Sequence, residues 1–311
     1  MKFQGLLLAF VILISIFLTT PRGQISLLQA RAPTVSQLKA QSAENFQFFT
    51  IPEGTFSMSV LETTVGNLAT SSKENAAQPK ISAQIFLVKF LNSNTTLKQL
   101  KSQDRWPIAS LTKLMTALIA VEKIDLDSEI ELSKKAVESE GTIGDFESGE
   151  IYKARDLLKA MLVLSSNDAA AALAESIGID KFAMDKRAAE LGMEDTNFND
   201  PTGLSYLNQS TANDLSKLVD YIYFHHPEIF DFTKEKTISI LELGKGQTKI
   251  LNSVNEFSGQ PNFLGGKTGF IDESKGNLIS LFNDSFGRGP ILIIVLGSED
   301  RFGDTLWLLP K

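Results

Sequence analysis

A serine and a lysine stand three residues apart in the stretch "IASLTKLMTAL", residues 108–118. At this spacing Ser110 and Lys113 face the same side of a helix, so their side chains can touch. A serine hydroxyl becomes a nucleophile when a base takes its proton, and a lysine can act as that base when burial lowers its pKa. From this stretch alone, Lys113 is either such a base or a side chain that extends to water beside a helix-capping serine.

A second pattern lies in "VLSSNDAAAAL", where Ser165 and Asn167 stand two residues apart between two predicted helices. A hydroxyl and an amide that project together from such a break can relay a proton and bind a peptide backbone. The alternative is helix capping, for which serine, asparagine and aspartate are favoured.

A third pattern is "FLGGKTGF", in which glycines precede a cation and a hydroxyl in a predicted strand. Lys267 and Thr268 could face an anionic group there, while backbone N–H groups near Gly269 face a ligand. The alternative is a glycine bend that carries a solvated lysine.

The surrounding elements predict an α+β fold. Strand-like segments stand at both ends of the region, and amphipathic helices lie between them. The predicted strands are "ISAQIFLVKF", "TTLKQLK", "GNLISLFN" and "GPILIIVLGS". The predicted helices are one that opens at Ser110, "ARDLLKAMLVL", "DAAAALAESIG" closed by Gly178, and "TANDLSKLVDYIYF". In this order the first and last strands can share one antiparallel sheet.

Composition excludes several kinds of function. The net charge of −7 argues against nucleic acid as a partner, because phosphate binding needs clustered cations. The chain has no cysteine, which excludes disulfides, zinc–thiolate sites and thiol nucleophiles. Its two histidines, His225 and His226, precede a proline and are predicted to end a helix. We therefore expect the base of any catalytic site not to be histidine.

The amino terminus carries an uncharged, mostly apolar run from Leu6 to Leu18 behind one lysine. This run has the length of a signal-peptide core and is short of the about 20 residues that a spanning helix needs. We predict a signal peptide or an uncleaved membrane anchor in residues 1–20. The polar residues 21–79 are predicted to form a tether, and residues 80–311 a catalytic domain.

The three patterns occur in the order Ser-x-x-Lys, Ser-x-Asn and Lys-Thr-Gly, which is the signature of penicillin-binding proteins and serine β-lactamases. The segments between them, such as "LGMEDTNFNDPTGL" and "STANDLSKL", extend the likeness. Over roughly residues 80–311 the chain resembles the D-alanyl-D-alanine carboxypeptidase family, the low-molecular-mass penicillin-binding proteins. The resemblance implies a β-lactamase/transpeptidase-like fold, an antiparallel sheet flanked by helices with an all-helical subdomain.

The resemblance also implies a role for each residue. Ser110 is the expected nucleophile, Lys113 its general base, and Ser165 a proton relay toward the leaving D-alanine. Asn167 is expected to bind the peptide and orient Lys113. Lys267, Thr268 and Gly269 are expected to bind the substrate, with Lys267 holding its carboxylate and lowering the pKa of Lys113. The oxyanion hole is expected to use the backbone N–H groups of Ser110 and Phe270.

The implied substrate is a peptidoglycan stem peptide that ends in D-Ala-D-Ala, and β-lactam antibiotics are the implied covalent inhibitors. No metal or organic cofactor is implied. The implied location is extracytoplasmic, either anchored to the membrane by the amino-terminal segment or secreted after cleavage. The chain ends soon after Lys-Thr-Gly, without the additional carboxy-terminal domain of many relatives, which favours the anchor.

Three other functions are alternatives to a carboxypeptidase. A class A β-lactamase needs a glutamate-bearing loop, usually Glu-x-x-Leu-Asn, and this string does not occur in the sequence. An inactive wall-binding protein would be expected to lack a motif residue, yet all are present. A DD-endopeptidase that cuts cross-links shares all three motifs and stays open. The chain departs from the family at Ile271 and Ser274, where a threonine and an alanine are usual, which leaves any contact from a hydroxyl at position 271 in doubt.

Overall fold

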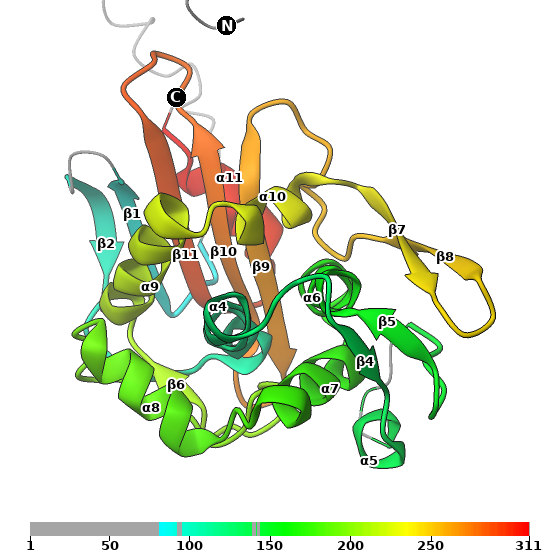
Figure 1. Cartoon of the computed structure of the whole chain (residues 1–311). Coiled ribbons are helices and arrows are strands. Elements are labelled where there is room, and N and C mark those ends of the chain that lie inside the picture. Colours follow the sequence, from blue (N-terminus) through cyan, green and yellow to red (C-terminus); the bar gives the residue numbers. More distant parts are fainter. Residues whose placement is uncertain (1–80, 92–94, 139–140, 142–143, 311) are drawn as a thin grey trace, which may run out of the picture. The chain divides into compact units, whose positions relative to one another are not determined.

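The main sheet joins strands from both ends of the region that the structure describes. The structure is a computed structural model that describes residues 81–91, 95–138, 141 and 144–310 (Figure 1). Five antiparallel strands lie in the order β2-β1-β11-β10-β9. Their bounds are β1 Ile85–Phe90, β2 Thr96–Leu100, β9 Phe263–Ile271, β10 Lys275–Asn283 and β11 Pro290–Ser298.

The first and last strands of this sheet are neighbours, as the sequence predicts. Strand β1 pairs antiparallel with β11, with Ile85 opposite Leu296. Strand β2 is the hairpin partner of β1 on the other side. Residues 92–94 of the "NSNTT" turn lie outside the described residues. The pairing of β1 with β11 makes β11 the central strand of the five.

Strand β11 is apolar along its whole length because both of its faces are covered. Side chains alternate between the two faces of a strand, so neighbouring residues enter different cores. Leu292, Ile294 and Leu296 pack with the helices on one face. Ile291, Ile293 and Val295 pack in a second core with Phe257 and Leu308. The second core lies under α11 (Arg301–Leu308), which Figure 1 shows behind the sheet.

The other face carries the remaining helices, with α4, α9 and α10 in front of the sheet in Figure 1. Helix α4 is buried along its first eight residues, Lys113 to Ala120, which makes it the central helix of this layer. The bounds are α4 Lys113–Lys123, α5 Lys134–Val137, α6 Ala154–Val163, α7 Asn167–Ile177, α8 Lys181–Glu190, α9 Ala212–His225 and α10 Glu228–Lys234.

Two predicted helix ends are confirmed and one predicted start is wrong. Helix α7 is closed by Gly178 in the left-handed region, at φ 65°, and α9 ends at His225. The helix predicted to open at Ser110 begins instead at Lys113, and Ser110 lies in the short 3₁₀ helix η1 (Ala109–Thr112) before it. The backbone of Ala109 at φ 50° prevents an α-helical start there.

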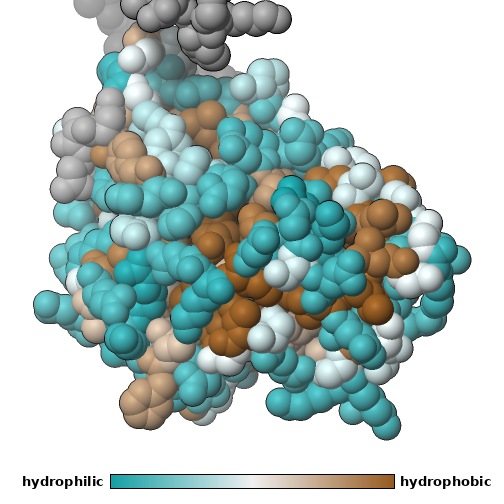
Figure 2. All heavy atoms as spheres, in the orientation of Figure 1, coloured by the Kyte–Doolittle hydropathy of each residue, from teal (hydrophilic) through white to brown (hydrophobic). Residues whose placement is uncertain are grey.

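Three small two-stranded sheets complete the fold. They pair β3 (Trp106–Pro107) with β6 (Gln209–Ser210), β4 (Glu129–Glu131) with β5 (Ile151–Lys153), and β7 (Thr237–Glu242) with β8 (Gln247–Asn252). The β7–β8 hairpin is absent from the sequence-based prediction. Figure 2 shows hydrophobic side chains over the centre of this face and toward that hairpin, in a mostly hydrophilic surround. Leu241 and Ile250 of the hairpin are exposed.

The predicted α+β fold is confirmed. The amino-terminal segment and the tether, residues 1–20 and 21–79, lie outside the described residues, so these two predictions stay untested. Within residues 81–310, apart from the gaps named above, no helix has the length and apolar character that a membrane crossing requires.

The central strand offers a test of the core. Ile294 is fully buried between the sheet and the helices. We expect Ile294→Ala to lower the free energy of unfolding by about 2–5 kcal/mol, because the truncation removes apolar contacts and leaves a cavity. Ile250→Ala on β8, where the side chain is 63% exposed, should change it by less than about 0.5 kcal/mol. Urea unfolding of both variants checks this, and equal effects would contradict the assignment of this core.

Candidate active site

The turn that carries Ser110 is held in a strained conformation. Ala109 has φ 50°, and the N–H of Leu111 donates to the carbonyl of Ile108 at 3.1 Å. A residue other than glycine in this region costs free energy, so surrounding contacts must hold it in place. Two glycines lie directly against this turn. They come from the loop at Gly203 and from strand β9 at Gly269.

Both glycines are required by close approach. A Cβ on Gly203, which has φ +85°, would overlap the carbonyl oxygen of Ala109. A Cβ on Gly269 would lie 3.0 Å from the carbonyl oxygen of Ile108 and 3.3 Å from the nitrogen of Ser110. The loop and the edge strand therefore press against the serine turn from two sides, which no residue with a side chain would permit without displacement.

Lys113 lies one turn after Ser110 and is fully buried. Its Nζ donates to Ser110 Oγ at 3.1 Å, to Asn167 Oδ1 at 2.7 Å, and to the carbonyl of Thr202. Burial lowers its pKa to about 7, against a smaller opposing effect of the Asp200 carboxylate. A lysine in this state is neutral in a substantial fraction of molecules near neutral pH.

The Asp200 carboxylate fixes the loop that presents the Thr202 carbonyl. It accepts hydrogen bonds from the N–H groups of Thr202 and Gly203 at 2.8 Å and from that of Ser205 at 2.9 Å. Asn208 Nδ2 donates to the same carboxylate at 2.9 Å. Burial raises the pKa of Asp200, but hydrogen bonds from the Thr202 hydroxyl and from the main-chain N–H groups of Ser205, Gly203 and Thr202 more than offset that effect and hold the pKa below its ordinary value. The loop is therefore folded around a permanent negative charge near Lys113.

Ser165 and Lys267 form a second contact beside the first. Ser165 lies between α6 and α7 at φ 65°, and Lys267 lies on β9. The ammonium of Lys267 donates to Ser165 Oγ at 2.9 Å and to the carbonyl of Thr268 at 2.8 Å. Burial, then the charges of Lys113 and Arg301, lower the pKa of Lys267 well below its ordinary value. The family resemblance implied that Lys267 lowers the pKa of Lys113, whereas burial is the main cause at Lys113.

Residues of all three motifs open onto one cavity of about 300 Å³. Both lysines lie buried next to residues that line it. Ile271, where the family usually has a threonine, also lines it. The other predicted residues along its wall are Ser110, Ser165, Asn167, Thr268, Gly269 and Phe270. The structure thus brings every residue predicted for the site into one place.

Two groups at this site were not predicted from the sequence. Arg301, the first residue of α11, lines the cavity and its Nη1 donates to the carbonyl of Gly269 at 2.8 Å. The other is the Thr202 carbonyl, in a segment that was noted for its likeness to the family but given no role. An isolated arginine after a strand and a main-chain carbonyl carry no local sequence signal. Both groups reach the site only through the three-dimensional fold.

The two histidines lie at the end of α9. His225 stacks on Tyr221 with ring centroids 4.3 Å apart, and His226 Nδ1 lies 3.4 Å from a Glu228 oxygen. The group within hydrogen-bonding distance of Ser110 is Lys113. A serine beside a buried lysine, with a second serine–lysine contact at the same cavity, is an arrangement that can carry out acyl transfer through a serine.

The comparison with protein families narrows this class. A family model described as D-alanyl-D-alanine carboxypeptidase matches residues 72–299. The chain belongs to the D-alanyl-D-alanine carboxypeptidase family, which confirms the resemblance seen in the sequence.

Individual relatives carry two activity names. A D-alanyl-D-alanine carboxypeptidase of Mycobacterium tuberculosis is 28% identical over 231 residues, covering 72% of this chain and 78% of the relative. A D-alanyl-D-alanine endopeptidase of Pseudomonas aeruginosa is 34% identical over 209 residues, covering 63% of this chain and 64% of the relative. The fold matches a penicillin-binding protein of Listeria monocytogenes solved in its ampicillin-bound form, with TM-score 0.64 and 30% identity, covering 74% of this chain and 96% of the other.

The pKa of Lys113 gives a test of the base. Only the neutral amine can accept a proton from Ser110, so the rate of acylation by a labelled penicillin should rise with pH and level off above about 7. Below that value we expect a fall of about tenfold per pH unit. Acylation rates between about pH 5 and about pH 9 check this. Lys113→Arg, which keeps the charge at all these values, should abolish the rise, and a flat wild-type profile would contradict the assignment.

Proposed function

We propose that this chain is a serine-type D-Ala-D-Ala carboxypeptidase that removes the terminal D-alanine from peptidoglycan stem peptides through an acyl-enzyme on Ser110. The observation that carries the proposal is the buried Lys113 with its Nζ 3.1 Å from Ser110 Oγ. Membership of the D-alanyl-D-alanine carboxypeptidase family and the relative of that name support it.

In the proposed first step, the neutral amine of Lys113 takes the proton of Ser110, and Oγ attacks the carbonyl carbon of the penultimate D-alanine. The oxyanion that forms is stabilised by the backbone N–H groups of Ser110 and Phe270, two residues that face the same cavity. Asn167 orients Lys113 through the 2.7 Å contact and binds the substrate peptide.

In the next step Ser165 gives its hydroxyl proton to the nitrogen of the departing D-alanine as the C–N bond breaks. Ser165 then regains a proton from the Lys113 ammonium, which leaves Lys113 neutral again. The Lys267 ammonium, 2.9 Å from Ser165 Oγ, stabilises the oxygen that loses the proton. A water molecule then attacks the ester on Ser110 and gives a proton to Lys113. Lys113 returns a proton to Ser110 Oγ as the ester bond breaks, and the shortened stem peptide leaves. The Ser110–Lys113 contact thus serves the attack on the substrate, and the Ser165–Lys267 contact serves the departure of D-alanine.

The terminal carboxylate of the substrate is proposed to lie against Lys267, Thr268 and Arg301. Thr268 and Arg301 line the cavity, and Lys267 is buried beside Thr268. The side chain of Arg301 is partly buried, and this burial lowers its pKa, so an anion in the cavity would stabilise its charge. This cluster of cations favours a peptide that ends in a free carboxylate.

Penicillins are proposed to acylate Ser110 by the same first step. A penicillin-binding protein of Listeria monocytogenes, 30% identical, has been solved in an ampicillin-bound form, and it matches 74% of this chain. An antibiotic carboxylate would occupy the same cationic cluster as the substrate carboxylate. We further propose that the catalytic domain acts outside the cytoplasm, held by residues 1–20 as an anchor or released after their cleavage.

A second candidate activity is hydrolysis of cross-links by a DD-endopeptidase. The Pseudomonas aeruginosa relative with that name is 34% identical, more than the carboxypeptidase of Mycobacterium tuberculosis at 28%. The chemistry at Ser110 is the same for both activities. They differ in the amine that leaves, which is a free D-alanine in one case and a second stem peptide in the other.

Covalent labelling and product release test the proposal together. The wild-type protein should take up one labelled penicillin and release D-alanine from a D-Ala-D-Ala peptide, whereas Ser110→Ala should do neither. Ser253→Ala is a matched control, because this serine contacts Ser258 Oγ at 2.9 Å and supports a turn. Labelling of Ser110→Ala at the wild-type level would sink the mechanism.

Assays of the wild-type protein with other substrates distinguish the carboxypeptidase from a β-lactamase and from an endopeptidase. Rapid turnover of penicillin without D-alanine release would favour a β-lactamase. Faster cleavage of a cross-linked muropeptide than of its uncross-linked pentapeptide would favour the endopeptidase.

A further inference from the structure

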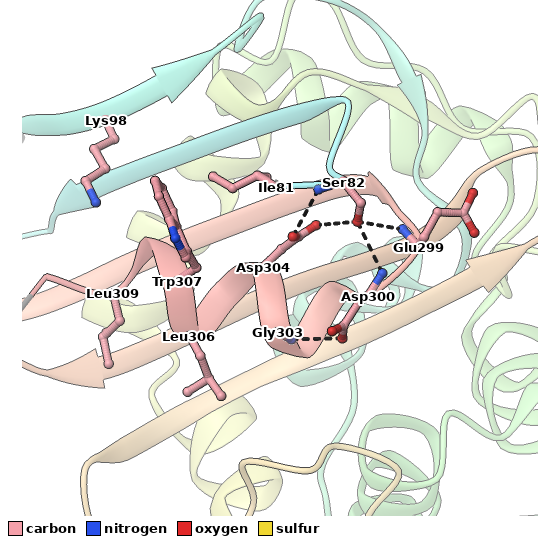
Figure 3. A pocket seen from close by; sticks show the side chains of 10 residues that line it. All are labelled: Ile81, Ser82, Lys98, Glu299, Asp300, Gly303, Asp304, Leu306, Trp307 and Leu309. Atoms are coloured by element: carbon pink, nitrogen blue, oxygen red, sulfur yellow. Dashed lines mark hydrogen bonds between the residues drawn. The ribbon is translucent and has the colours of Figure 1, made fainter. Parts of the chain in front are cut away.

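The first described residues of the chain are tied to helix α11 by a cluster of short hydrogen bonds (Figure 3). The Asp304 carboxylate accepts from Ser82 Oγ at 2.7 Å, from the N–H of Ser82 at 3.1 Å and from the N–H of Ala83 at 2.8 Å. Ser298 Oγ, at the end of β11, donates to it at 2.6 Å. We call Ser82, Ser298 and Asp304 the α11 clasp. It lies at one side of a cavity of about 810 Å³.

The clasp also holds the segment that leads into α11. The N–H of Glu299 donates to Ser82 Oγ at 3.0 Å, and that of Asp300 donates to Ser298 Oγ at 3.0 Å. Asp300 then caps the helix by accepting from the N–H of Gly303 at 2.9 Å. The backbone just before Arg301 is therefore held by the hydrogen bonds of Glu299 and Asp300, and the backbone after it is held by the cap on Gly303.

Arg301 points from this turn toward the active site. Its side chain passes Gly276 on β10, where a Cβ would lie 3.3 Å from Arg301 Cδ and 2.7 Å from the carbonyl oxygen of Ser298. Beyond Gly276 its Nη1 reaches the carbonyl of Gly269 on β9 at 2.8 Å. The missing side chain at Gly276 thus leaves a passage from the helix on the far face of the sheet to the cavity.

We propose that the α11 clasp positions Arg301 for the substrate carboxylate, so that Ser82 and Asp304 are positioning residues for carboxylate recognition. The inference rests on the proposed function, in which Arg301 contributes to the site for that carboxylate. Asp304 stands three residues after Arg301, on the same turn, and is buried. The Asp304 carboxylate lies near the start of the helix and accepts hydrogen bonds from two other segments. It therefore fixes both the position and the orientation of the first turn relative to the sheet.

The position of the first turn of α11 matters because the Arg301 side chain must extend from it to the Gly269 carbonyl. Arg301 works at the end of a long, flexible side chain, so a small shift of its Cα moves the guanidinium relative to Gly269 and Thr268. Displacements of about 1 Å in a positioning group can cost about a hundredfold in rate. Loss of the Ser82 hydroxyl removes its bonds to Asp304 and to the N–H of Glu299. Loss of the Asp304 carboxylate removes the acceptor for the N–H groups of Ser82 and Ala83 as well, so in both cases the first turn of α11 is held less firmly.

The test compares substrates that differ only in the carboxylate. The specificity ratio is kcat/KM for a peptide ending in D-Ala-D-Ala divided by kcat/KM for its carboxy-terminal amide. We expect Arg301→Ala to lower this ratio by about tenfold or more, the size of a lost hydrogen bond to a charged group. Ser82→Ala and Asp304→Asn should lower it by about threefold or more, with Arg301 still present. Ser82→Thr, which keeps the hydroxyl, should restore it.

A second pair of ligands covers the case of slow amide turnover. Acylation rates with a penicillin and with its methyl ester give the same ratio without a peptide product. Ser133→Ala is the matched control, because Ser133 caps α5 by accepting from the N–H of Ala136 at 3.0 Å, away from the cavity. It should lower thermal stability and leave the ratio unchanged.

The outcomes separate the clasp from the proposed function. An unchanged ratio in Ser82→Ala and Asp304→Asn, with a reduced ratio in Arg301→Ala, overturns the clasp and keeps the carboxylate site. An unchanged ratio in Arg301→Ala overturns both roles, while D-alanine release by the wild type still tests the activity. In the Arg301→Ala background, Ser82→Ala should have no further effect on the ratio, and an additive effect would also overturn the inference.

Discussion

The site depends on the burial of one amine. Lys113 is enclosed by apolar neighbours on α4, and its three hydrogen-bond acceptors come from three separate segments. A buried ammonium is costly, so the protein holds the group close to the point where it loses its proton. Acceptors with no proton to give, the Asn167 and Thr202 oxygens, fix the amine without competing for its lone pair. The Asp200 charge opposes the loss of the proton and keeps the pKa from falling further.

The rest of the fold brings rigid elements to that amine. Strand β9 is an edge strand, which leaves its outer side free to meet a ligand, and Gly269 lets it lie directly against the serine turn. The break between α6 and α7 presents Ser165 and Asn167 from the helical layer. Helix α11 adds Arg301 from behind the sheet. The cavity thus sits where the sheet, the helical layer and the far-side helix meet, and each supplies a different charge or hydroxyl.

The local motifs and the pairing of the first and last strands were predicted from the sequence, whereas the close contacts between distant loops and strands at the site were not. The spacings of Ser110 with Lys113 and of Ser165 with Asn167 are local and act within one turn or one helix break. Strand β11 is buried on both faces, which explains why a continuous apolar run bounded by turn residues was recognised as a strand. The 3₁₀ form of the serine turn depends on Gly203 and Gly269, which are distant in sequence, so it could not be predicted. The β7–β8 hairpin was missed because most of its residues are exposed and its pattern of apolar residues is weak.

The pairing of β1 with β11 has a consequence for the order in which the enzyme becomes active. Ser110 and Lys113 are made early, but Lys267 and Arg301 arrive only with the last strands and helix, and the sheet cannot close until β11 lies beside β1. Contacts between such distant segments form late and slowly in folding. In the proposed mechanism, a newly made chain therefore carries Ser110 before the last segments that would complete its site are in place. Uptake of a labelled penicillin in a growing culture would report finished folding as well as the presence of the protein.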